Sequence, residues 1–213
     1  MGLNNINIKE RMEHYNVTGL SMTLIENGQI SLVDQYGLLE AETTKSVNSD
    51  SIFNACSVSK FVTGMLVMKL TEQGLLDLNE DINKRLKSWK FLIINTLRNL
   101  LCHQSGTIDP VDSFTELRSN DGIPSTVELL EGKTSYCKVP IEVRYEPGSD
   151  FQYSDAGFCI IQQLIEDVTV RPFEDVINDL IFLPLKMDKS SFPITIQMKK
   201  GKTSLVAIIK MEN

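Results

Sequence analysis

The chain has 213 residues, of which 42% are hydrophobic and 23% are charged. This composition is ordinary for a globular protein, and the length is sufficient to bury a core. The net charge of −7 argues against a nucleic-acid-binding protein, because no basic surplus is present to neutralise phosphates. No stretch approaches the roughly 18 apolar residues of a membrane helix, and the N-terminus resembles no secretory signal, so we expect a cytoplasmic protein.

The N-terminal part of the chain predicts a helix followed by a β-hairpin. Residues Ile6–Tyr15 have mixed helical spacing, and β-rich runs follow at Thr18–Glu26 and Gln29–Tyr36. The two runs are joined by Asn27-Gly28, which is the strongest short-range signal for a hairpin. We therefore expect an antiparallel pair of strands beside an N-terminal helix.

From Ser57 onward the pattern becomes mostly helical. Between Gly106 and Phe151 the chain is rich in loops, and a last apolar run at Leu205–Met211 fits one strand. The prediction is a single α+β domain over residues 1–213, with an N-terminal antiparallel hairpin and a large helical lobe. Helices are expected at Ser57–Gln73, Ile93–Leu101, Thr126–Leu130, Ala156–Thr169 and Pro172–Ile181.

A serine and a lysine stand three residues apart at the start of the first helix of this lobe, in the sequence SVSK. Residues at i and i+3 share a helix face with Cβ atoms roughly 5–6 Å apart, so Lys60 can reach the Ser57 hydroxyl. Ser135 and Lys138 have the same spacing, but turn residues flank them and no helix would hold the lysine in place. Ser57 is therefore the candidate nucleophile.

The sequence carries no signal for a cofactor or a metal ion. The four cysteines are few and widely spaced, which is typical of reduced cysteines rather than a disulfide framework. Only two histidines are present, which argues against a histidine-based zinc site. The GKT stretches at residues 132–134 and 201–203 lack the earlier glycine of a P-loop, since Val127 and Ile196 stand there.

Several segments, in order, resemble the serine β-lactamase and penicillin-recognising hydrolase superfamily. They are residues 53–60 (FNACSVSK), 100–106 (LLCHQSG), 145–148 (YEPG) running into 151–158 (FQYSDAGF), and 183–187 (LPLKM). The closest branch is that of class C β-lactamases and D-alanyl-D-alanine carboxypeptidases, and the similarity spans residues 19–192. It implies a β-lactamase/transpeptidase-like fold and a serine hydrolase that acts through an acyl-serine intermediate on a β-lactam, a D-amino peptide or a small ester.

The resemblance also implies roles for individual residues. Ser57 would attack, Lys60 and Tyr153 would shuttle the proton, and the Ser57 backbone N–H would donate to the oxyanion. Each residue has a simpler alternative: an N-cap serine, a surface lysine and a core tyrosine. His103 invites a catalytic triad, but its segment matches a structural segment of the family, so a structural role is expected.

One departure from the family concerns substrate binding. The family has an asparagine where this chain has Asp155, and an ionised aspartate can only accept hydrogen bonds. Its charge would hold Lys60 protonated, which is the wrong state for a base. Alternatively, the acid stays protonated or binds a substrate that bears an amine. Asp155 is therefore expected to shift specificity or to weaken the activity.

A second departure concerns the family's third motif, Lys/His-Thr/Ser-Gly, which supplies another oxyanion donor from a downstream strand. The chain ends soon after residues 183–187, and the KTS sequence at residues 202–204 lacks the glycine. The C-terminal strands of the sheet are therefore expected to be largely missing, and losing an oxyanion donor costs ~10²–10³ in turnover. The alternative function is a catalytically impaired, truncated domain with a binding role or none, and an exposed sheet edge predicts self-association.

Overall fold

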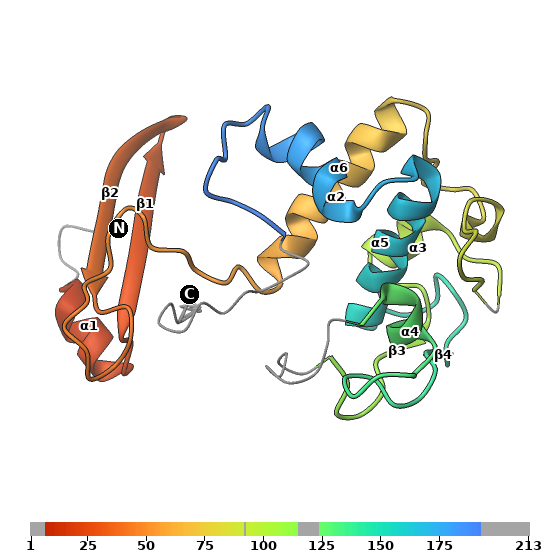
Figure 1. Ribbon diagram of the computed structural model, residues 1–213, viewed down its shortest axis with the longest axis horizontal. Coiled ribbons are helices and arrows are strands. Elements are labelled where there is room, and N and C mark those ends of the chain that lie inside the picture. Colours follow the sequence, from red (N-terminus) through yellow and green to blue (C-terminus); the bar gives the residue numbers. More distant parts are fainter. Residues whose placement is uncertain (1–6, 92, 115–123, 193–213) are drawn as a thin grey trace. The chain divides into compact units, whose positions relative to one another are not determined.

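The computed structural model describes residues 7–91, 93–114 and 124–192 (Figure 1). The described part of the chain divides into two compact units, one within residues 7–56 and one within residues 57–192. The strand predicted at Leu205–Met211 lies outside the described residues.

The first unit contains a helix and a hairpin, as the sequence predicted. Helix α1 (Ile8–His14) precedes strand β1 (Gly19–Glu26), which pairs antiparallel with β2 (Gln29–Gly37). Asn27 and Gly28 at the turn both have positive φ, 52° and 77°, as a two-residue turn matched to the strand twist requires. The side chain of Met12 in α1 is buried, and its methyl group lies close to Gly37 at the end of β2. A Cβ added to this glycine would come within 2.9 Å of the Met12 Cε atom. Helix and hairpin therefore pack through this contact.

The second unit is built around one central helix, α5. Its elements in order are α2 (Val58–Glu72), the 3₁₀ turn η2 (Ile82–Lys84), α3 (Leu97–Leu101), β3 (Thr107–Ile108), α4 (Thr126–Leu130), β4 (Glu142–Val143), α5 (Asp155–Thr169), α6 (Phe173–Ile177) and the π-helical turn η3 (Asn178–Phe182). Strands β3 and β4 pair antiparallel. Helix α5 contacts α3, α4, α6 and β3, and in Figure 1 it lies among the other helices of the unit.

The core of this unit explains why α5 is central. Its apolar residues recur at helical spacing, and Ala156, Ile160, Ile161, Leu164 and Ile165 are all buried. They belong to one cluster with Leu66, Val67 and Leu70 of α2 and with Leu97 and Leu100 of α3. Burying one such Leu or Ile side chain contributes about 1.5–3 kcal/mol. The start of α5 is therefore placed firmly relative to α2 and α3.

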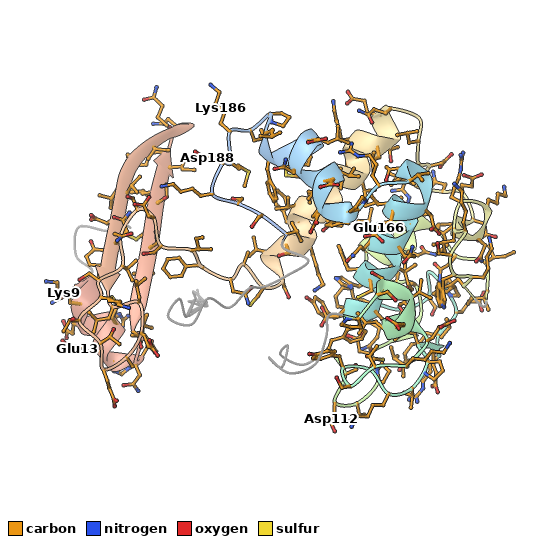
Figure 2. All side chains as sticks on the ribbon, in the orientation of Figure 1. Lys9, Glu13, Asp112, Glu166, Lys186 and Asp188 are labelled. Atoms are coloured by element: carbon orange, nitrogen blue, oxygen red, sulfur yellow. The ribbon has the colours of Figure 1, made fainter. Side chains whose placement is uncertain are left out.

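The polar residue Glu166 links α5 to the helix that follows it (Figure 2). Its carboxylate accepts a hydrogen bond from the Phe173 N–H at 3.2 Å, at the start of α6. The predicted helix Pro172–Ile181 is divided in the structure, because α6 ends at Ile177 and a π-helical turn follows. The predicted helix from Ile93 begins only at Leu97, because Thr96 is extended and its side chain accepts from the Asn99 N–H. Within the described ranges, no helix is long and apolar enough to cross a membrane.

Asp167 joins the other end of α5 to a loop. Its carboxylate accepts hydrogen bonds from the Ser88 N–H at 2.9 Å, the Ser88 hydroxyl at 2.5 Å and the Gln163 amide at 3.2 Å. Burial alone would raise the pKa of Asp167, but hydrogen bonds from Ser88 and Lys87 outweigh burial and lower the pKa below its ordinary value. The ionised carboxylate therefore stabilises the fold.

Replacing Asp167 with asparagine is expected to lower the free energy of unfolding at neutral pH by about 1–3 kcal/mol, because buried N–H donors would face an amide NH₂. Since the native pKa lies below the unfolded value of about 3.9, the contribution is present above that pH and is lost as the pH falls through the native pKa. Urea unfolding of wild type and variant at pH 7 and pH 3 measures the loss of stability and its dependence on pH. An equal difference between variant and wild type at the two pH values would contradict the expectation.

Candidate active site

Ser57 stands at the N-terminus of helix α2. Its backbone is in the helical region, and its side chain makes no capping hydrogen bond to the helix. The side chain is exposed, and its hydroxyl instead accepts a hydrogen bond from the Tyr153 hydroxyl at 2.7 Å. Ser57 therefore occupies the N-cap position of α2 without the side-chain capping bond of an ordinary N-cap serine.

Tyr153 reaches Ser57 from the segment just before α5. Its side chain is 42% exposed, so it is not a core tyrosine. The His103 ring stacks on the Tyr153 ring with centroids 4.4 Å apart and planes inclined by 26°. The phenol is thus held against Ser57 by a second aromatic ring.

Lys60 lies on the same helical turn as Ser57, with a side chain only 17% exposed. It forms an ion pair with Asp155, and its Nζ lies 5.0 Å from the centroid of the Tyr153 ring and 5.5 Å from that of Phe158. A largely covered lysine with these partners is not a free surface lysine. The structure therefore brings together Ser57, Lys60, Tyr153 and Asp155, all four of the residues singled out from the sequence.

The ion pair determines the charge of Lys60. Burial would lower the pKa of the Lys60 ammonium, but hydrogen bonding to Asp155 and to Tyr153 outweighs burial and raises the pKa above its ordinary value of 10.5. Lys60 is therefore protonated at neutral pH, which is the consequence predicted for an aspartate at position 155. The Asp155 side chain remains 42% exposed, and its Oδ1 binds Lys60.

His103 has a supporting position rather than a triad position. Its Nδ1 accepts a hydrogen bond from the Ser154 N–H at 3.1 Å, and Phe151 and Phe158 lie near its ring. Burial lowers the pKa of the imidazole, and the positive charge of Lys60 lowers it further. A neutral ring that accepts at Nδ1 fits this hydrogen bond. The hydrogen bonds found for the described residues do not join His103 to Ser57.

Sequence reasoning missed one residue beside this site, Asp109. Its carboxylate accepts hydrogen bonds from Ser154, Asp155 and Ala156, where α5 begins. The only local signal was an aspartate before Pro110 in a loop-rich stretch, and no spacing rule connects it to a residue so far along the chain. Among the described residues, no group of three or more His, Cys, Asp or Glu side chains is arranged to hold a metal ion. The four cysteines form no disulfide.

Comparisons with known proteins agree with this fold. A sequence model of the Beta-lactamase family matches residues 5–207. Protein flp of Staphylococcus aureus (strain N315) is 25% identical over 194 residues, which cover 88% of this chain and 37% of the relative. The solved structure of an octameric penicillin-binding protein homologue from Pyrococcus abyssi has a TM-score of 0.69 and 25% identity, over 85% of this chain and 42% of that chain.

The fold is also that of D-amino acid amidase from Ochrobactrum anthropi SV3, with a TM-score of 0.70 and 23% identity, over 83% of this chain and 47% of that chain. The chain thus spans little more than a third of the length of the curated relative and less than half of each solved structure. The α+β prediction and its β-lactamase/transpeptidase-like architecture are confirmed. Since the family match covers nearly the whole chain, the chain belongs to the Beta-lactamase family.

Proposed function

We propose that this chain is a serine hydrolase that forms an acyl-enzyme at Ser57. The observation that carries the proposal is the 2.7 Å hydrogen bond between the Tyr153 and Ser57 hydroxyls, with Lys60 beside the same phenol. A serine hydroxyl is a weak nucleophile until a neighbouring group takes its proton, and Tyr153 is placed to do so. Membership of the Beta-lactamase family supports the same chemistry.

In the proposed reaction, Ser57 Oγ attacks the carbonyl carbon of the substrate and forms a tetrahedral oxyanion. The serine proton passes to the Tyr153 oxygen, and the phenol proton passes to Lys60 when its amine is neutral. The Ser57 N–H, at the positive end of the α2 dipole, donates to the oxyanion. Collapse expels the leaving group, which takes the proton back, and water then hydrolyses the acyl-serine ester.

We assign Asp155 to substrate binding. Only its Oδ1 is engaged by Lys60, and its side chain is partly exposed, so a substrate amine can approach the carboxylate. An ionised aspartate accepts hydrogen bonds and cannot donate one to a substrate carbonyl. The proposed substrates are a β-lactam, a D-amino peptide or a small ester, and small activated esters are expected to react best.

A second candidate function is ligand binding without turnover. The observation that favours it is the Lys60–Asp155 ion pair, because a protonated Lys60 cannot accept the proton that the reaction must move. In this case Ser57 would react slowly or not at all, and the site would hold a ligand. The two candidates differ in whether an acyl group is formed and released.

The test is covalent labelling followed by intact-mass measurement, with a fluorophosphonate and a fluorescent penicillin as probes. We expect a single adduct that peptide mapping places on Ser57, and an unchanged adduct in Ser135→Ala, the matched serine of the other S-x-x-K sequence. Release of the penicilloyl group over time indicates a hydrolase, and a permanent adduct indicates binding. The absence of any adduct at Ser57 would contradict the hydrolase.

We also propose that the chain self-associates through a strand edge. Among the described residues, β1 pairs only with β2, so this sheet has two outer edges. Unpaired edges favour pairing with another chain, and one structural relative is described as octameric. Size-exclusion chromatography with light scattering is expected to show a species larger than 24.0 kDa. A monodisperse monomer at all concentrations would contradict this proposal.

A further inference from the structure

The carboxylate of Asp109 lies against the start of helix α5. Its Oδ1 accepts from the Ser154 hydroxyl at 2.8 Å and from the Ala156 N–H at 3.0 Å, and its Oδ2 accepts from the Asp155 N–H at 2.7 Å. The Ser154 hydroxyl accepts in turn from the Gly157 N–H at 3.1 Å. The first N–H groups of a helix have no partner within it. Asp109 and Ser154 together satisfy three of them.

The two sequence neighbours of Ser154 carry the candidate chemistry. Tyr153 donates to Ser57, and Asp155 forms the ion pair with Lys60. The hydrogen bonds that Asp109 accepts come from the Ser154 side chain and from backbone N–H groups, not from the Tyr153 or Asp155 side chains. Asp109 therefore fixes the backbone from which both side chains project.

Asp109 is itself held on an ordered support. It follows strand β3, in which Thr107 is fully buried and pairs with Val143 of β4. The same segment supplies His103, whose Nδ1 accepts from the Ser154 N–H and whose ring stacks on Tyr153. The backbone N–H groups of residues 154, 155 and 156 are thus all bound by side chains from residues 103 and 109.

We propose that Asp109 is a positioning residue for the reaction at Ser57, acting through Ser154 and the start of α5 on Tyr153. The inference rests on the proposed function, because it assigns a role within that reaction. A displacement of about 1 Å at a reacting group can reduce a rate by ~10². The Tyr153 hydroxyl must meet Ser57 within hydrogen-bond distance, so a small shift of its backbone is sufficient.

The experiment is a double-mutant cycle on the rate of acylation and on ester hydrolysis, with Asp109→Asn, Tyr153→Phe and the double variant. Asparagine keeps the shape of the side chain but places an NH₂ group against backbone donors. We expect Asp109→Asn to lower kcat by about 10- to 100-fold with little change in KM. In the Tyr153→Phe background, Asp109→Asn should lower kcat about threefold or less, because the hydroxyl that Asp109 positions is absent.

Asp167→Asn is the matched control, because this aspartate is hydrogen-bonded in the same way near the other end of α5. It should lower Tm and leave kcat unchanged. All rates are compared well below the Tm of each variant. Should Asp109→Asn not fold, Ser154→Ala removes one of the three bonds to Asp109 and is expected to give a smaller loss of kcat with the same dependence on Tyr153.

If Asp109→Asn lowers kcat by the same factor in the wild type and in Tyr153→Phe, the positioning role is overturned. It is also overturned if Asp109→Asn leaves the kcat of the wild type unchanged. In both cases the wild-type adduct at Ser57 remains, so the proposed function survives. If the wild type itself forms no adduct at Ser57, the proposed function fails, and this inference fails with it.

Discussion

Replacing Ser57 with alanine is expected to abolish covalent labelling and to remove nearly all of the ester hydrolysis. Loss of a serine nucleophile typically costs on the order of 10⁴–10⁶ in kcat, because the remaining groups of the site act only through it. The fold should remain intact. Loss of a capping serine costs about 1 kcal/mol, and the Ser57 hydroxyl makes no capping bond to α2, so the cost here is smaller still.

The matched control is Ser59→Ala, which removes a hydroxyl from the same turn of α2 without touching the Tyr153 hydrogen bond. It should label and hydrolyse as the wild type does. Circular dichroism and Tm of both variants establish that they are folded. Equal ester hydrolysis by wild type and Ser57→Ala would eliminate the hydrolase and leave the binding function.

The sequence predicted those parts of the fold that local rules determine. The hairpin followed from two β-rich runs around Asn27-Gly28, and the turn has the positive φ values that this pair of residues favours. Helix α5 followed from its apolar spacing and is the buried centre of its unit. One error lies at a boundary, where Thr96 caps α3 and delays its start relative to the predicted Ile93, and another lies inside the predicted helix Pro172–Ile181, which a π-helical turn divides after Ile177.

The site residues also differ in whether local rules could predict them. The placement of Ser57 and Lys60 on one turn follows from helix geometry alone. Tyr153 and Asp155 are far along the chain, and only the family resemblance connected them to Ser57. Asp109 was not predicted because its hydrogen bonds to the start of α5 depend on the packing of β3 against that helix, and a single aspartate in a loop gives no pattern that would reveal them.

Replacing Asp155 with asparagine is expected to raise turnover at neutral pH and to shift the pH profile downward. In the wild type, hydrogen bonding to Asp155 is the first of the effects that raise the pKa of Lys60 against the lowering effect of burial. Removing the carboxylate leaves burial less opposed, so the pKa of Lys60 falls. Only the neutral amine can accept the proton that Tyr153 passes on, so the active fraction increases as the pKa falls.

The direction can be checked through the pH dependence of acylation. The pKa of Lys60 in the wild type lies above 10.5, so at lower pH the neutral fraction of its amine increases about tenfold for each unit by which the pH is raised. The rate should therefore increase with pH throughout the neutral and moderately alkaline range. In Asp155→Asn the same rise should occur at lower pH, and each unit by which the pKa falls should increase the rate at pH 7 about tenfold.

The control variant is Asp188→Asn, which removes an exposed carboxylate from the segment after η3 (Figure 2) and should leave the profile unchanged. A cationic ester and its neutral isostere separate two effects of Asp155. If the carboxylate binds a substrate amine, Asp155→Asn should raise KM for the cationic ester alone, while the increase in kcat should appear for both esters. If Asp155→Asn leaves the pH profile of acylation unchanged and lowers kcat for both esters, the charge of Asp155 assists the reaction. Lys60 then does not act as the base of the reaction.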